Sequence, residues 1–140
     1  MSRILLLIAL LIPTTLSARD FNSNADIREF TDKVMKQVSS GDLNGGLSLI
    51  SDAYTIVPKA ELEALKGQAM LQVPVMESRF GKNIGYEFLS ESSAGKSVLK
   101  FVYLQKFEKH AIVWHFVFYK PKDKWLMNSF NYSDSILNEL

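Results

Sequence analysis

Hydrophobic and polar residues alternate along the second half of the chain. The alternation forms four runs, at residues 84–91, 98–107, 111–119 and 125–132, separated by turn-forming or charged residues. A period of two is typical of β-strands, because successive side chains point to opposite faces of a sheet. Runs this close together in sequence are joined by hairpins. The pattern therefore predicts a four-stranded antiparallel sheet.

The run at Ala111–Tyr119 is apolar on both of its sides. Trp114 and Phe116 share one side, whereas Val113 and Val117 lie on the other. A strand with two apolar sides is covered on both faces of its sheet. We therefore expect this run to be the central strand.

The first half of the chain shows helical spacing. Between residues 24 and 38, apolar residues recur every three or four positions and charged residues occupy the other side. A shorter helix is expected after Asp42, and a third begins at Pro58, because the missing N–H of proline costs nothing in a first turn. Pro74 is expected to kink or end this third helix near Gln72, with one further helical turn as an alternative at residues 75–80 before Gly81.

Helices followed by a run of hairpins are the order of an α+β domain, in which helices cover one face of an antiparallel sheet. The chain has 140 residues, which is the length of a single domain with its own core. A last helical turn is expected over residues 133–140. The fold class predicted for residues 19–140 is therefore α+β, with N-terminal helices packed on a four-stranded antiparallel sheet.

Residues 1–18 have the composition of a secretory signal peptide. Arg3 supplies a short positive start, residues 4–12 are all apolar, and the small residues that follow permit cleavage after Ala18. A spanning helix needs roughly 20 apolar residues, so this run is too short for a membrane anchor. We expect an exported protein, periplasmic or secreted, that has no contact with a membrane after cleavage.

Composition and charge exclude several classes of function. The formal net charge is +1, from 16 basic and 15 acidic residues. Such a balanced chain lacks the basic surface that nucleic acids or anionic membranes attract, so no nucleic-acid partner is expected. The chain has no cysteine, which excludes disulfides, thiolate chemistry and a lipid-attachment cysteine.

The order of the expected elements also resembles a known family. A helical pair joined by residues 40–43 (SGDL), a third helix and four long strands resemble the nuclear-transport-factor-2-like superfamily, of the cystatin-like α+β type. Residues 119–121 (YKP) and 125–130 (WLMNSF) are similar to the end of small exported bacterial members of unknown function. The resemblance covers nearly all of residues 19–140. It implies a curved sheet that encloses, with its helices, a cone-shaped pocket used for catalysis, ligand binding or dimerisation.

Aromatic residues suggest where a ligand would bind. Most of the nine phenylalanines, five tyrosines and two tryptophans lie in the second half of the chain. One interpretation is a pocket for a small apolar ligand, with Trp114 in its wall and Tyr103, His115 and Tyr119 as orienting polar groups. A second is a homodimer through the sheet face, which explains the two apolar sides of the third strand. A third is a large aromatic core in which His115 is packed and hydrogen-bonded by its neighbours.

Enzymatic chemistry has less support in the sequence. Ketosteroid-isomerase-type members of the superfamily place a carboxylate or a His–Asp pair in the pocket, since proton abstraction needs an oriented base. No aspartate falls inside an expected strand, and Glu87 and Glu91 fit a solvated edge strand. His110 and His115 are five residues apart and fall on opposite faces, so no metal site is expected.

These observations favour one function and leave others open. The favoured one is an exported, non-enzymatic binding or accessory domain for a small apolar ligand or a protein partner, without a metal or cofactor. The alternatives are an isomerase or lyase of the ketosteroid-isomerase type, which uses a pocket histidine or carboxylate, and a structural module of an envelope assembly.

Overall fold

The computed structural model describes residues 19–140, and the signal peptide predicted at residues 1–18 lies outside the described residues. Three helices precede most of the sheet: α1 (Asn24–Ser39), α2 (Leu43–Ala53) and α3 (Lys59–Phe80). The strands are β1 (Asp20–Phe21), β2 (Asn83–Ala94), β3 (Val98–Phe107), β4 (Ala111–Tyr119) and β5 (Trp125–Ser133). A short 3-10 helix, η1 (Ile136–Glu139), follows β5 and confirms the predicted last helical turn. The α+β class is confirmed.

The sheet has five strands, not the predicted four, in the order β1-β5-β4-β3-β2 with every pair antiparallel. The additional strand, β1, is only two residues long and pairs with the start of β5. It is held by Phe21, whose ring lies 5.1 Å from that of Phe30 and 5.4 Å from that of Phe118. Such a short strand leaves no alternating pattern in the sequence. The prediction that β4 is the central strand is confirmed.

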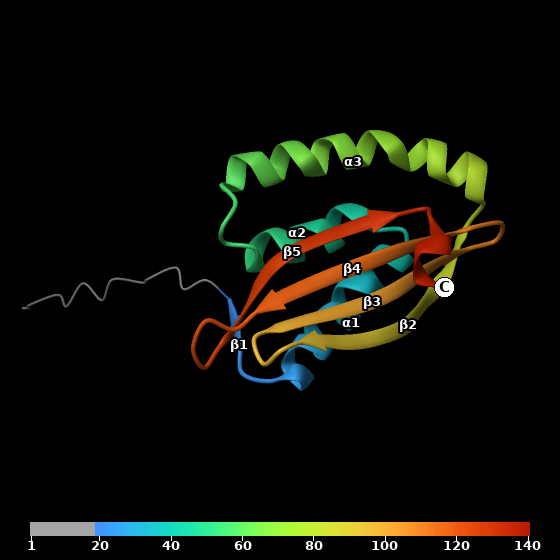
Figure 1. Ribbon diagram of the computed structural model, residues 1–140. Helices are drawn as coiled ribbons and strands as arrows, with labels where there is room; N and C mark the ends of the chain where they lie inside the picture. The colour runs from blue at the N-terminus through green and yellow to red at the C-terminus, as the bar shows by residue number, and fades with distance from the viewer. Residues whose placement is uncertain (1–18) are drawn as a thin grey trace, which may run out of the picture.

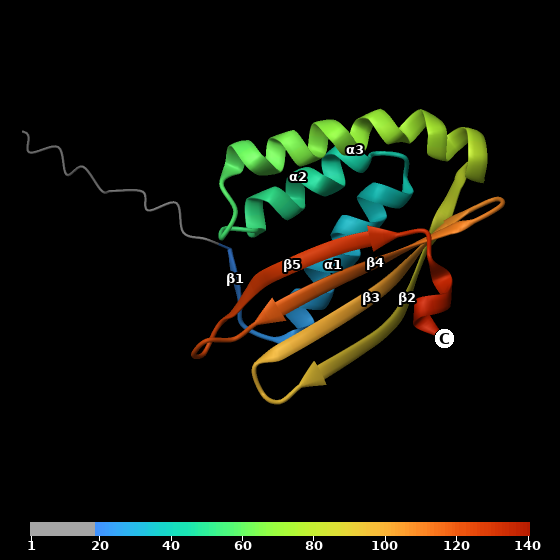
Figure 2. The ribbon, with the colours of Figure 1, turned by 45° about the horizontal axis from the view of Figure 1, so that its top comes forward.

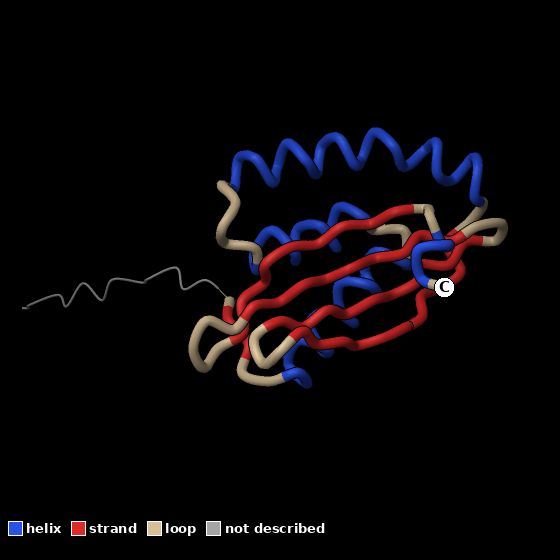
Figure 3. The backbone as a smooth tube through the Cα atoms, viewed as in Figure 1, coloured by secondary structure: helices blue, strands red, loops and turns tan. Residues whose placement is uncertain are grey.

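Helices α1 and α2 cover one face of the curled sheet, which we call the inner face (Figures 1 and 3). The helix α1 begins at Ser23, whose Oγ accepts a hydrogen bond from the Asp26 N–H at 3.2 Å. Its buried residues recur at the predicted helical spacing and face the sheet: Ile27, Phe30, Thr31, Val34, Met35 and Val38. The aromatic core therefore lies between this helix and strands β3 and β4.

The two helices of the α1–α2 hairpin cross very closely at Gly46. A Cβ atom at this position would lie 2.4 Å from Cγ2 of Val38, which is too close for any side chain. Glycine lowers the intrinsic stability of a helix. Here its presence is explained by the packing, because only glycine allows α2 to approach α1 this closely.

Helix α3 does not end near Gln72, as its proline suggested, but continues through Pro74 to Phe80. Only Leu62 and Ala69 of this helix are buried, and Leu71 is 79% exposed. Water can therefore replace the backbone hydrogen bond that the proline removes. The views in Figures 1 and 2 show that α3 runs alongside α2, beyond the β5 side of the sheet. None of the helices within residues 19–140 is both long and apolar enough to cross a membrane.

Candidate functional site

The four residues predicted to line a pocket are divided between the two faces of the sheet. Tyr103 and Trp114 are cross-strand neighbours on the inner face and are almost completely buried. His115 follows Trp114 in β4 and points to the opposite, outer face, as does Tyr119. The structure therefore brings Tyr103 and Trp114 together, but these two do not share a cavity with His115 and Tyr119.

Tyr103 belongs to a hydrogen-bonded network that ties α1 to the sheet. Its hydroxyl lies 2.7 Å from Thr31 Oγ1 and donates to Asp32 Oδ1 at 3.0 Å. Asp32 also pairs with Arg28 at 3.1 Å, and the Arg28 guanidinium lies 3.5 Å from the centroid of the Phe88 ring. Burial, and secondarily the bond to Asp32, raises the pKa of Tyr103 well above its ordinary range. These contacts give Tyr103 a structural role.

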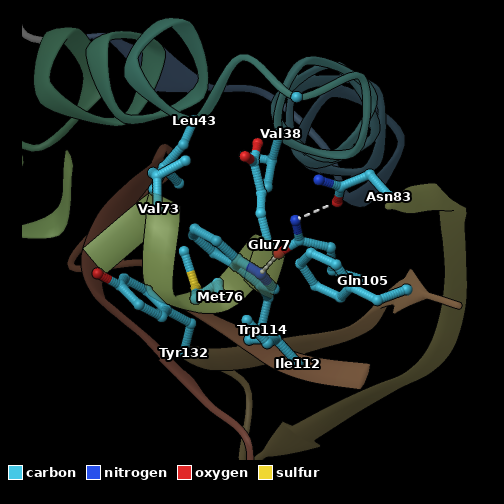
Figure 4. Close-up of a pocket in the computed structure, with 12 residues that line it drawn as sticks. Val38, Leu43, Val73, Met76, Glu77, Asn83, Gln105, Ile112, Trp114 and Tyr132 are labelled. Atoms are coloured by element: carbon cyan, nitrogen blue, oxygen red, sulfur yellow. Dashed lines mark hydrogen bonds between the residues drawn. The ribbon is translucent and has the colours of Figure 1, made fainter. Parts of the chain in front are cut away.

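Trp114 fills the inner face rather than lining an open pocket (Figure 4). Its Nε1–H donates to Gln105 Oε1 at 3.0 Å, and Gln105 Nε2 donates to Asn83 Oδ1 at 2.6 Å. The cavity beside these residues, below α3, has a volume of about 20 Å³. This space is large enough for one water molecule and too small for an organic ligand.

His115 is packed and hydrogen-bonded on the outer face. Its Nδ1 lies 2.9 Å from Asn131 Oδ1, and its Nε2 lies 2.6 Å from Glu139 Oε1 in η1. Both ring nitrogens are therefore engaged by neighbouring side chains. This geometry matches the interpretation of His115 as a hydrogen-bonded packing residue that holds the C-terminal turn against β4.

The burial of residues on the outer face also explains why β4 is apolar on both sides. Val102 and Val113 point to this face and are at most 1% exposed within a single chain. Because η1 contacts β4 on this face, no second subunit is needed to cover these residues. The homodimer through the sheet face stays a prediction.

The structure has several open hollows of about 350 to 480 Å³, one of them on the outer face beside His115. The most apolar of them is a cleft between α2, α3 and β5, with a volume of about 410 Å³. Its walls are mainly apolar, with contributions from all three elements: Leu47 and Ile50 of α2, Leu65 and Ala69 of α3, and Phe130 and Tyr132 of β5. The Tyr54 ring closes one end by an edge-on contact with Phe130, at 6.0 Å between centroids. We refer to this space as the α3 cleft.

Polar residues from all three elements lie among the apolar ones in the lining of the α3 cleft, and they include Gln68, Gln72 and Asn131. Glu61 and Lys66 lie on α3, and Lys66 is bound to Glu63 at 3.0 Å and to Ser48 at 3.2 Å. Ser51 of α2 has a buried hydroxyl without a hydrogen-bond partner among the described residues. Burial raises the pKa of the Tyr132 phenol, which stays neutral. The cleft is therefore suited to an uncharged, mainly apolar group.

The sequence pattern predicted the helix and the strand that carry several residues of the α3 cleft, but it did not predict the cleft. Leu62, Leu65 and Ala69 recur at helical spacing in α3, yet Leu62 and Ala69 are buried whereas Leu65 is half exposed. Phe130 and Tyr132 were placed correctly in the last strand. A hydrophobic period does not distinguish residues that fill a core from residues that line a space, and this is why the cleft was missed.

No group of three or more metal-binding side chains occurs within the described part of the chain. Comparisons of the chain with protein-family models, with curated proteins and with solved structures find no match.

Proposed function

We propose that this protein is a non-enzymatic binding domain that holds an apolar group of its ligand in the α3 cleft. The observation that carries the proposal is the mainly apolar lining of this cleft of about 410 Å³, whereas the cavity inside the core measures only about 20 Å³. Ligand sites of proteins are mostly apolar clefts of roughly 300–1,000 Å³ with a few polar groups. The α3 cleft has this size and this chemistry.

Binding is favoured over proton abstraction because the cleft lacks an enclosed base. The carboxylate in its lining is that of Glu61, which is exposed at the start of α3. Asp32, which does contact a buried tyrosine, lies in the α1 network and outside the cleft. An oriented base inside the site is the requirement for chemistry of the ketosteroid-isomerase type.

The nuclear-transport-factor-2-like assignment and the export of the protein are part of the same proposal. A curled antiparallel sheet with three helices beside it supports this assignment at the level of architecture. The composition of residues 1–18 supports export to the periplasm or beyond the cell. The ligand would then be captured outside the cytoplasm.

A fluorescence titration with the neutral dye Nile red tests the proposal. Ala69→Phe places a ring in the cleft, whereas Ala64→Phe places the same ring on the exposed side of α3. We expect saturable binding to the wild type and to Ala64→Phe, and at least about tenfold weaker binding to Ala69→Phe, since a filled pocket excludes its ligand. Absence of saturable binding, or equal affinities of the two variants, contradicts the proposal.

A second pair of variants tests the cleft independently, in case Ala69→Phe does not fold. Leu65 and Leu71 are both exposed leucines of α3, at 50% and 79%, but only Leu65 lines the cleft. Leu65→Glu is expected to weaken dye binding, because it brings a charge to the apolar wall. Leu71→Glu should have no effect, and an equal loss in both variants would speak against the α3 cleft.

A further inference from the structure

Among residues 19–140, no strand lies beside one edge of β5 over most of its length. Strand β1 pairs only with Trp125 and Leu126. From Met127 to Ser133, within residues 19–140, no strand lies on the side of β5 that faces away from β4. Along an edge strand, every second residue directs its N–H and C=O groups away from the neighbouring strand. This part of β5 therefore presents unpaired backbone groups.

The α3 cleft lies along this free edge. Three consecutive residues of β5 line it: Phe130, Asn131 and Tyr132. Consecutive side chains point to opposite faces, and that of Asn131 bonds His115 on the outer face. The cleft is therefore bounded by the backbone edge of β5 itself, in addition to side chains of its inner face. Figures 1 and 2 show α3 beyond this edge of the sheet, with α2 beside it.

The opposite wall carries groups that suit a peptide backbone. Gln68 and Gln72 of α3 line the cleft, one turn of helix apart. A glutamine amide both donates and accepts hydrogen bonds, as a peptide group does. Leu65 and Ala69 lie beside them and offer apolar contacts. A small apolar molecule would leave the edge of β5 and these amides unpaired, whereas an extended polypeptide can pair with both.

We propose that the ligand of the α3 cleft is an extended, uncharged polypeptide segment of a partner protein, which adds to the sheet as a strand on β5. This inference rests on the proposed function, since it names the class of ligand. The segment continues the line of β1, which already shows that this edge accepts an antiparallel strand. Backbone pairing would provide affinity, and apolar side chains at alternate positions would enter the cleft beside Phe130 and Tyr132.

The length of the edge defines the segment. The seven residues from Met127 to Ser133 extend over about 23 Å at the usual rise of a strand. The bulge near Asn128, where the β4–β5 register shifts, marks the end next to β1. The paired part is therefore expected to centre on Phe130, between the bulge and the C-terminal end of β5.

Selection from a random-peptide display library, followed by backbone modification, tests the inference. The tightest peptide is synthesised in three forms: unmodified, N-methylated at its odd-numbered residues and N-methylated at its even-numbered residues. A strand that pairs along one edge uses only alternate N–H groups. We expect one methylated form to lose at least about tenfold in affinity and the other to retain it, because each lost backbone bond weakens binding.

Hydrogen exchange then locates the peptide. Alternate amides between Met127 and Ser133 are expected to exchange at least about tenfold more slowly with the unmodified peptide bound, since new hydrogen bonds protect them. Ala69→Phe should abolish this protection and Ala64→Phe should preserve it.

The possible outcomes separate the two proposals. Failure to enrich a peptide, equal affinity of the two methylated forms, or protection away from β5 overturns the polypeptide ligand. If Nile red still distinguishes Ala69→Phe from Ala64→Phe, the cleft then binds small apolar molecules and the proposed function stands. If the dye shows no such difference, both proposals fail.

Discussion

The ring of Tyr132 stacks on the indole of Trp114, with 4.6 Å between centroids and 26° between planes. Tyr132 lines both the small cavity near Gln105 and the large α3 cleft, so one ring separates a water-sized space from a ligand-sized one. Trp114 is in turn fixed by its bond to Gln105. The wall of the cleft is therefore supported by a buried, hydrogen-bonded part of the core.

Trp114→Ala is expected to lower the free energy of unfolding by about 3–5 kcal/mol, the usual cost of removing a large buried ring. The side chain is 1% exposed and its loss also leaves Gln105 Oε1 without a donor. Urea unfolding measures the change. Tyr119→Ala is the control, because this ring is 45% exposed, and its loss should be under about 1 kcal/mol. A similar cost for both variants would contradict the assigned faces of β4.

Tyr103→Phe is expected to cost about 1–3 kcal/mol near neutral pH, since it removes the two hydrogen bonds that join the buried hydroxyl to Thr31 and Asp32 of α1. The cost should shrink at alkaline pH. Burial raises the pKa of folded Tyr103, so above the ordinary value of about 10 the unfolded chain loses this proton first, and the stabilisation falls as pH rises. Urea unfolding of both proteins between about pH 8 and pH 11 checks this, because the window brackets the ordinary tyrosine pKa. A pH-independent difference would show that Tyr103 titrates normally.

Replacement by alanine is expected to have opposite effects on stability at two glycines in helices. Gly46→Ala is expected to destabilise the protein, because the new Cβ would meet Val38 Cγ2 at 2.4 Å and force α1 and α2 apart. Gly67→Ala should stabilise by up to about 1 kcal/mol, since nothing lies within 4 Å of its Cβ position and alanine is the better helix former. The thermal unfolding midpoints of the two variants show whether helix packing or helix propensity determines the effect of alanine at each position. If Gly46→Ala were more stable than the wild type, α1 and α2 would not approach each other this closely at Gly46.

The elements and the core followed from the sequence because their patterns are local. The alternation in residues 98–132 identified three strands, and the two apolar sides of Ala111–Tyr119 identified the central one. Strand β1 was missed because its pairing with β5 joins residues that are far apart in the chain. No local pattern carries that information.

The candidate site was harder to predict because it depends on where α3 lies. Whether Leu65 fills a core or lines a space is decided by the distance between α3 and β5, and periodicity does not contain this distance. His115 was predicted to orient a ligand because it lies between two aromatic residues, Trp114 and Phe116. The sequence pattern does not show which groups bond its ring. Its partner Glu139 lies 24 residues later, in the short C-terminal turn.

His115→Phe is expected to leave Nile red binding unchanged, because His115 lies on the outer face and the cleft lies on the inner one. The variant loses the bonds to Asn131 and Glu139, so the C-terminal turn should loosen. Faster exchange of the η1 amides would report this, with Glu139→Gln as the milder comparison. A large loss of dye affinity would instead assign His115 to the binding site.

The most direct test of the α3 cleft is a map of backbone chemical shifts during titration with the neutral dye Nile red. The account predicts saturable changes confined to the lining of the cleft, in α2 around Leu47 and Ile50, in α3 around Leu65 and Ala69, and in β5 around Phe130. Amides of the outer face near Tyr119 should not move. Changes that centre on the outer face, or no saturable change, would contradict a binding site between α2, α3 and β5.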